Sequence, residues 1–102
     1  MQVQYNYSAV EKTDGLEAHI RDQLDRAIGR FEDRLTRVEV HVADLNGPNK
    51  PGPGDMRCRF EARPAGHQPI VVDDEGSDLH AVINAAAHKL ERALAKRLDP
   101  HS

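Results

Sequence analysis

The sequence predicts an α+β fold, a two-layer sandwich in which a four-stranded sheet carries two helices on one face in the order β-α-β-β-β-α. Four short segments alternate apolar and polar side chains, as half-buried strands do. Two longer segments repeat apolar side chains every three or four residues, as amphipathic helices do. Because each element is apolar on one side only, the helices and the sheet must bury those sides against each other. We expect the chain to form one domain, residues 1–102.

The first strand and the first helix are predicted near the N-terminus. Residues 3–7 (VQYNY) alternate and contain two aromatic side chains, which favours a strand. Thr13 or Asp14 can cap the following helix, and Glu17 occupies the capping-box position relative to Asp14. Gly29 inside this helix costs about 1 kcal/mol, so either a close neighbour needs the space or the helix tolerates it. The apolar stripe predicts about six turns and consists of Leu16, Ile20, Leu24, Ala27, Ile28, Phe31 and Leu35.

Three more strands are predicted in the middle of the chain. Alternation around Val38, Val40 and Val42 predicts the second strand and leaves outward Arg37, Glu39 and His41. Residues 46–55 (NGPNKPGPGD) are rich in Pro and Gly, which predicts an exposed loop. Residues 68–74 predict a short fourth strand, with Pro69 at its start or edge. The third strand, residues 56–63, directs inward Met56, Cys58, Phe60 and Ala62, and outward Arg57, Arg59, Glu61 and Arg63. We expect the outward face of the sheet to stay open to solvent.

The second helix is predicted from Ser77 or Asp78, either of which can cap it, to Asp99 before Pro100. Acidic residues are expected around its start, where they favour the helix dipole: Asp73, Asp74, Glu75 and Asp78. Its buried stripe consists of Leu79, Ile83, Ala86, Leu90, Leu94 and Leu98, widened by Val82 and Ala93.

Composition narrows the class of protein. The formal net charge is −3, and no run of about 18 apolar residues is present, so we expect no membrane span. The first residues lack the basic and apolar regions of a signal peptide. A single cysteine, Cys58, excludes an intramolecular disulfide. We therefore expect a cytoplasmic protein.

The residues favour no catalytic or metal chemistry. We find no nucleophile paired with a base, and the prolines of residues 47–54 remove amides that a phosphate loop would need. His80, Asn84 and His88 share one helix face but lack a third strong ligand, which favours a solvated polar face over a metal site. Cys58 alternates inward as a small buried hydrophobe. We expect no enzyme, cofactor, metal or small-molecule substrate.

The cations of the second helix suggest a binding surface. Lys89, Arg92 and Lys96 are spaced three and four apart, which places them along one exposed face. Two interpretations fit: the cations complement the helix dipole, or the row binds phosphates independently of base sequence. The first predicted helix adds Arg26, Arg30, Arg34 and Arg37, offset by Asp22, Asp25, Glu32 and Asp33.

Two segments resemble the ribosome hibernation-promoting factor family, also called ribosome-associated inhibitor or sigma-54 modulation proteins. Residues 10–42 (VEKTDGLEAHIRDQLDRAIGRFEDRLTRVEVHV) are similar to the family's first helix and valine-rich strand. Residues 77–97 (SDLHAVINAAAHKLERALAKR) are similar to its second helix. The resemblance implies a fold related to double-stranded-RNA-binding domains. It also implies a non-enzymatic cytoplasmic factor that binds the small ribosomal subunit under stress or in stationary phase, silencing translation from the channel of messenger and transfer RNA.

The resemblance also implies which cations contact ribosomal RNA. Lys89, Arg92 and Lys96 match family cations on the second helix, and Arg26 and Arg34 match basic positions of the first. With the less regular Arg97 and the neighbouring Arg30, the expected RNA-binding set is Lys89, Arg92, Lys96, Arg97, Arg26, Arg30 and Arg34. Since the chain ends soon after the second helix, it resembles a short form without the C-terminal dimerisation domain.

The sequence departs from the family pattern in its net acidic charge, in His80 where Tyr is common, in Ala86 and Ala87 where bulkier aliphatics are common, and in the insertion 46–55. These departures support a second hypothesis, a protein-interaction or weakly homodimerising stress module that keeps the fold without ribosome binding. The two hypotheses differ in salt dependence, because only phosphate contacts weaken steeply as ionic strength rises.

Overall fold

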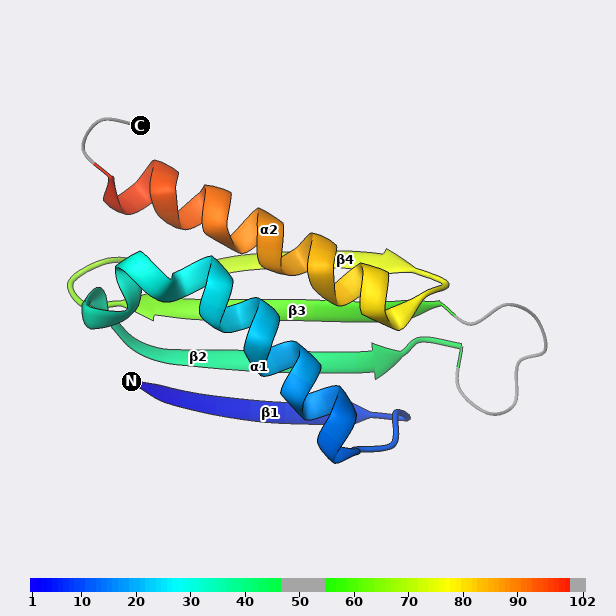
Figure 1. Cartoon of the computed structure of the whole chain (residues 1–102). Coiled ribbons are helices and arrows are strands. Elements are labelled where there is room, and N and C mark those ends of the chain that lie inside the picture. Colours follow the sequence, from blue (N-terminus) through cyan, green and yellow to red (C-terminus); the bar gives the residue numbers. More distant parts are fainter. Residues whose placement is uncertain (47–54, 100–102) are drawn as a thin grey trace.

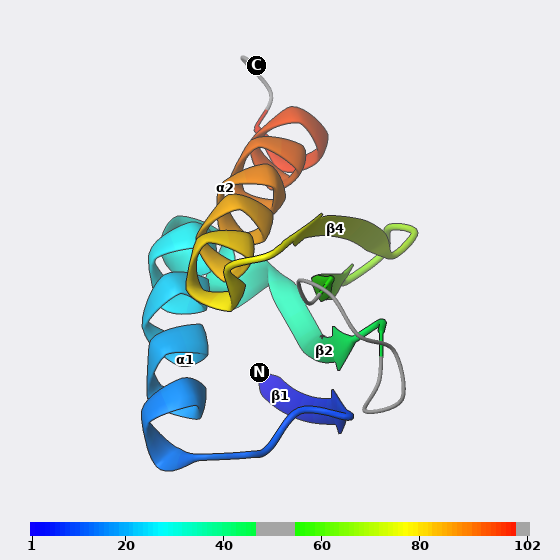
Figure 2. The same cartoon turned by 90° about the vertical axis from the view of Figure 1, so that its right-hand side faces the viewer.

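The computed structural model describes residues 1–46 and 55–99. The elements, in chain order, are β1 (Gln2–Ser8), α1 (Asp14–Ile28), the 3-10 segment η1 (Gly29–Arg34), β2 (Leu35–Asp44), β3 (Met56–Pro64), β4 (Ile70–Gly76) and α2 (Leu79–Leu98). The strands form one sheet in the order β1-β2-β3-β4, with β1 parallel to β2 and the other pairs antiparallel (Figure 1). Figure 2 shows both helices on the same face of this sheet. The predicted fold class is therefore confirmed.

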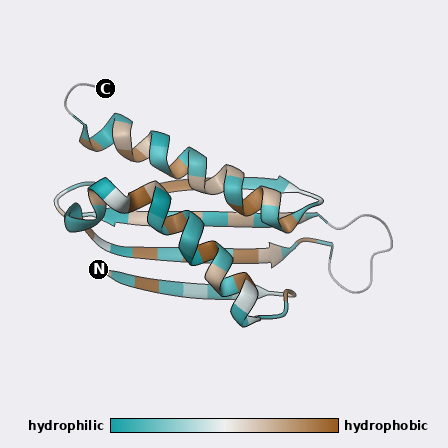
Figure 3. Cartoon of the chain, viewed as in Figure 1, coloured by the Kyte–Doolittle hydropathy of each residue, from teal (hydrophilic) through white to brown (hydrophobic). Residues whose placement is uncertain are grey.

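The core lies between the helices and the inward face of the sheet. Hydropathy alternates along the strands (Figure 3), and the valines of β2 pair in register with Phe60 and its inward neighbours on β3. Phe60 is fully buried together with Ile20 and Leu24 of α1 and Leu90 of α2. Because both helices contribute to this one cluster, their positions relative to the sheet are set by packing.

The first helix is shorter than predicted. It ends at Ile28, and Gly29 begins a 3-10 segment, so the six-turn helix through Leu35 is wrong. Leu35 is the first residue of β2, and a register shift between Leu35 and Arg37 places Leu35 and Val38 on the same buried side. That bulge gives a strand residue the spacing of a helical one. A Cβ at Gly29 would meet no atom within 4 Å, so no close neighbour requires the glycine.

The acidic segment before α2 is also differently placed. Asp73, Asp74 and Glu75 belong to β4, which extends to Gly76, and the first turn of α2 contains no acid. Asp78 alone caps α2, accepting hydrogen bonds from the amides of His80 and Ala81. At the N-terminus of α1 the cap is Thr13, whose hydroxyl accepts from the amide of Leu16. The loop predicted at 46–55 and the role of Pro100 lie mostly outside the described residues.

Candidate nucleic-acid interface

Two cations of α2, Arg92 and Lys96, make no ion pair or hydrogen bond with any residue that the structure describes. Arg92 and Lys96 line a shallow hollow together with Lys89 and Ala93. Within residues 1–46 and 55–99, the cations that have neither an ion pair nor a hydrogen bond are Arg57, Arg92 and Lys96. A cation without a partner can approach a phosphate without first breaking a contact. Arg92 and Lys96 are therefore the most available positive charges on the helical side of the domain.

Lys89 and Arg97 of α2 make hydrogen bonds to β4, the edge strand, and to the residues just before it. The Lys89 ammonium donates to the Asp73 carbonyl at 2.9 Å and to the Asp74 carboxylate at 3.0 Å. The Arg97 guanidinium donates to the Gln68 carbonyl at 3.1 Å, just before β4. Half of the Lys89 side chain is exposed. Its charge is already compensated by Asp74, so it adds less to the binding of an anion than Lys96 does.

The arginines of η1 lie against the C-terminal end of α2. Arg34 donates to the Leu98 carbonyl at 2.8 Å, satisfying one of the carbonyls that a helix leaves unpaired at its end. Arg30 pairs with Asp99 at 3.3 Å, and its guanidinium lies 4.5 Å from the centre of the Phe31 ring. The fold therefore brings Arg30 and Arg34 to the last turn of α2, the turn that contains Lys96 and Arg97.

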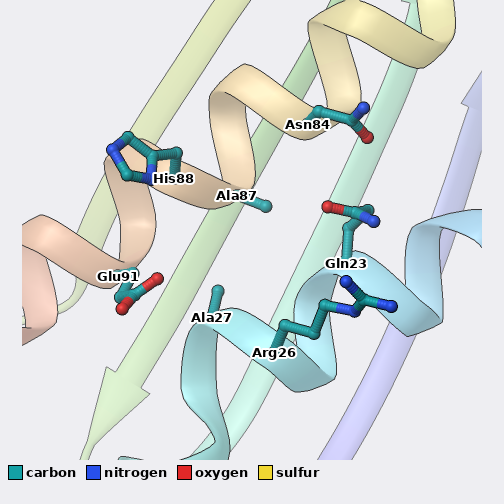
Figure 4. Close-up of a pocket in the computed structure, with 7 residues that line it drawn as sticks. All are labelled: Gln23, Arg26, Ala27, Asn84, Ala87, His88 and Glu91. Carbon is teal, nitrogen blue, oxygen red and sulfur yellow. The ribbon is translucent and has the colours of Figure 1, made fainter.

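Arg26 lies apart from these groups. Its side chain is 74% exposed and pairs with Asp22 at 3.3 Å. It lines a groove between α1 and α2 (Figure 4). The hollow of Arg92 and Lys96 also includes Lys89, which contacts β4, and so lies on the side of α2 that faces β4. The seven predicted residues thus form three groups: the α2 hollow, the end of α2 and the groove between the helices.

The open face of the sheet is polar but largely neutralised. The predicted outward row of arginines is present, and acids of the same or of a neighbouring strand pair with most of it: Arg37 with Glu39, Arg59 with Asp73, and Arg63 with Glu39 and Glu61. Hydrogen bonds of the Glu61 carboxylate with Glu39 and then Arg63 lower its pKa. Arg37 lies in β2, as the predicted second strand has it, and does not continue the row of arginines of the first helix. Arg57 is the unpaired cation on this face among the described residues, close to His41.

Cys58 is positioned as a core residue. It is fully buried beside Asp74, and burial raises the pKa of its thiol to about 12. The thiolate needed for nucleophilic attack or metal binding is thus strongly disfavoured. In the part of the chain that the structure describes, no three His, Cys, Asp or Glu side chains are grouped as a metal site would require.

One polar contact between the helices was missed by sequence reasoning. The His19 ring of α1 stacks on the His80 ring of α2, with centroids 4.3 Å apart and planes at 15°. His19 Nε2 also donates to Asn84 Oδ1 at 2.8 Å. Because the partners are more than 60 residues apart, no local pattern signals the contact.

Family comparison agrees with the fold. The chain belongs to the family described as sigma 54 modulation protein / S30EA ribosomal protein, whose model matches residues 3–101. Membership of this family makes the chain a ribosome-associated protein. No individually curated protein matches the chain in sequence.

Two solved structures have the same fold. A ribosomal subunit interface protein from Coxiella burnetii superposes with a TM-score of 0.78 at 18% identity, covering 95% of this chain and 97% of that one. The N-terminal domain of Protein Y from Thermus thermophilus gives 0.71 at 21% identity, covering 94% of each chain. Among the residues described, no helix has the length and apolarity to cross a membrane.

Proposed function

We propose that this protein binds the small ribosomal subunit in the cytoplasm and silences translation under stress or in stationary phase, without a catalytic step. Arg92 and Lys96 contact phosphates of ribosomal RNA in the channel that messenger and transfer RNA would occupy. The observation that carries the proposal is that these two cations have no partner among residues 1–46 and 55–99, although the protein has more acidic than basic side chains. Family membership supports the ribosome as the partner.

The uneven distribution of charge makes binding compatible with the net acidic balance. Between Lys89 and Arg97, α2 carries four cations and one acid, Glu91. Two acids of β4 are neutralised within the domain, Asp73 by Arg59 and Asp74 by Lys89. RNA at short range responds to the local potential, since charges more than about 8 Å away are screened at physiological salt. The domain should therefore approach RNA with the C-terminal half of α2 first.

Co-sedimentation tests this proposal. Purified protein is mixed with small subunits and with whole ribosomes at low and at raised salt, and the bound fraction is measured. We expect salt-sensitive binding that the double variant Arg92→Glu/Lys96→Glu abolishes. The matched control is Lys12→Glu/Arg21→Glu, which changes the net charge equally at two ion-paired cations of the α1 side. Equal loss in both variants, or no binding of the wild type at low salt, would contradict the proposal.

A second candidate is a homodimerising module, and β1 favours it. This edge strand (QVQYNYS) has no charged side chain and no proline, the features by which edge strands usually avoid pairing with another chain. A second copy could pair with it across a two-fold axis. Light scattering across a range of concentrations at high salt distinguishes the candidates, because strand pairing survives salt that dissociates phosphate contacts.

A further inference from the structure

The groove between α1 and α2 is lined by two alanines, one from each helix, and by polar side chains (Figure 4). Its floor is formed by the methyl groups of Ala27 and Ala87, both nearly fully buried. Gln23 and Asn84 line one end, and His88 and Glu91 line the other. The volume is about 190 Å³. Two small residues at the helix contact thus leave a hollow that bulkier aliphatic side chains would fill.

The polar groups of the groove are oriented and remain available. Asn84 Oδ1 accepts from His19, whose ring is fixed by its stack on His80, so the amide nitrogen of Asn84 keeps both hydrogens for a ligand. Gln23 makes one long contact, 3.5 Å from Nε2 to Asp22, and its Oε1 accepts from no described group. The groove therefore offers amide donors beside an amide acceptor, with the Glu91 carboxylate as a second acceptor and the Arg26 guanidinium, paired with Asp22, as a further donor.

These groups suit a neutral planar heterocycle that carries an exocyclic amine. A single side-chain amide matches the amine donor and ring-nitrogen acceptor of adenine, whereas guanine presents two acceptors on the corresponding edge. Glu91 repels a phosphate but accepts from an amine. His88 can stack on a base, as aromatic side chains do when they recognise single-stranded RNA.

The groove is also well placed relative to the free cations. Glu91 and Arg92 are adjacent in sequence, yet Glu91 lines the groove and Arg92 lines the hollow on the other flank of α2. The two sites are separated by the exposed width of one helix, about 10 Å. A single strand can cross α2 with its phosphates on Arg92 and Lys96 and one base turned into the groove.

We propose that the groove between α1 and α2 binds one unstacked adenine base of an RNA strand whose phosphates contact Arg92 and Lys96. This inference rests on the proposed function for the presence of RNA. It adds a base-reading site to a surface whose cations are indifferent to base sequence.

Fluorescence anisotropy with labelled hexaribonucleotides tests the proposal on the full chain. The probes are oligo-A, oligo-C, oligo-U and an abasic strand of the same length, so that the phosphates are constant and only the base varies. We expect oligo-A to bind about tenfold more tightly than the abasic strand, the gain typical of one well-matched amide–base pair. Unlabelled adenosine should compete only at far higher concentration than oligo-A.

Substitutions in the groove test whether a preference for oligo-A depends on it. Gln23→Leu removes the amide at similar size, and Ala87→Leu fills the floor; both should abolish the preference for oligo-A while leaving the affinity for the abasic strand unchanged. Ala81→Leu makes the same change at an exposed position of α2 outside the groove and should preserve the preference. Thermal unfolding of each variant checks that the helices stay packed, and Gln23→Leu remains decisive if Ala87→Leu fails to fold.

The outcomes separate this inference from the proposed function. Equal affinity for all four strands, or oligo-C binding as tightly as oligo-A, would overturn the adenine site while leaving the phosphate contacts in place. If adenosine competed as strongly as oligo-A, the ligand would be a free nucleoside. That result would overturn the proposal that the groove binds a base of an RNA strand. An adenine preference without co-sedimentation on ribosomes would support the groove and contradict the proposed function.

Discussion

Replacing Arg92 and Lys96 by glutamine should flatten the salt dependence of ribosome binding. Each phosphate contact contributes about 0.7 to 0.9 to the slope of log affinity against log salt, the lower value for single strands and the higher for duplex DNA. Because neither cation has a partner among the described residues, each should contribute the whole slope of one phosphate contact. The slope should therefore fall by roughly 1.4 to 1.8. The wild type should then lose about tenfold more affinity than the double variant between about 50 and 200 mM salt.

The assay is co-sedimentation with purified small subunits at four salt concentrations, with the bound fraction fitted at each. The control Lys12→Gln/Arg21→Gln removes the same charge from two ion-paired positions near the N-terminal half of α1 and should leave the slope unchanged. An unchanged slope in Arg92→Gln/Lys96→Gln would refute the reasoning, because it would mean that these cations meet no phosphate. An equal fall in the control would show a response to net charge alone.

Three further predictions concern the contact of Lys89 with β4, the N-terminal cap of α1 and the buried thiol of Cys58. Lys89→Gln should flatten the salt slope less than Lys96→Gln, since Asp74 already compensates Lys89, and should lower the free energy of unfolding by less than about 1 kcal/mol in urea titration, as exposed ion pairs do. Thr13→Ala should lower it by about 1 kcal/mol in the same titration, because the amide of Leu16 loses its acceptor, whereas the matched control Thr13→Ser keeps the hydroxyl acceptor and should leave it nearly unchanged. Stability should fall as pH rises above 9, the ordinary pKa of a thiol, because the unfolded chain then releases the Cys58 proton that the folded protein retains up to about pH 12. Urea titrations between pH 8 and 11 should show a smaller fall in Cys58→Ala than in the wild type, and parallel curves would contradict this assignment.

The strands and the second helix could be predicted because their local pattern matches their environment. Val38, Val40 and Val42 alternate inward as expected, and Asp78 caps α2 as one of two expected candidates. The end of α1 could not be predicted, because Phe31 of the 3-10 segment and Leu35, the first residue of β2, continue the spacing of the helical stripe in the sequence. Periodicity alone does not distinguish these cases.

The residues of the candidate site could be predicted from the sequence, but which of its cations are free to bind phosphate could not. Sequence spacing identifies Lys89, Arg92 and Lys96 as a row, but it cannot show that Asp74 of β4 pairs with the first and leaves the other two free. The same limit applies to the groove, whose walls come from two helices far apart in the chain. Such contacts depend on tertiary packing, which a one-dimensional pattern does not record.

The parallel pairing of β1 with β2 has a consequence for how the chain acquires its structure. β2, β3 and β4 are antiparallel neighbours along the chain, so their contacts close comparatively short loops. β1 pairs with β2, which begins at Leu35, so it cannot dock until α1 and β2 have been synthesised. As an edge strand separated from β2 by α1, β1 should dock late, and its amides should exchange with solvent sooner than those of β3 inside the sheet. The first strand of the described sheet therefore depends for its pairing on elements that follow it in the chain.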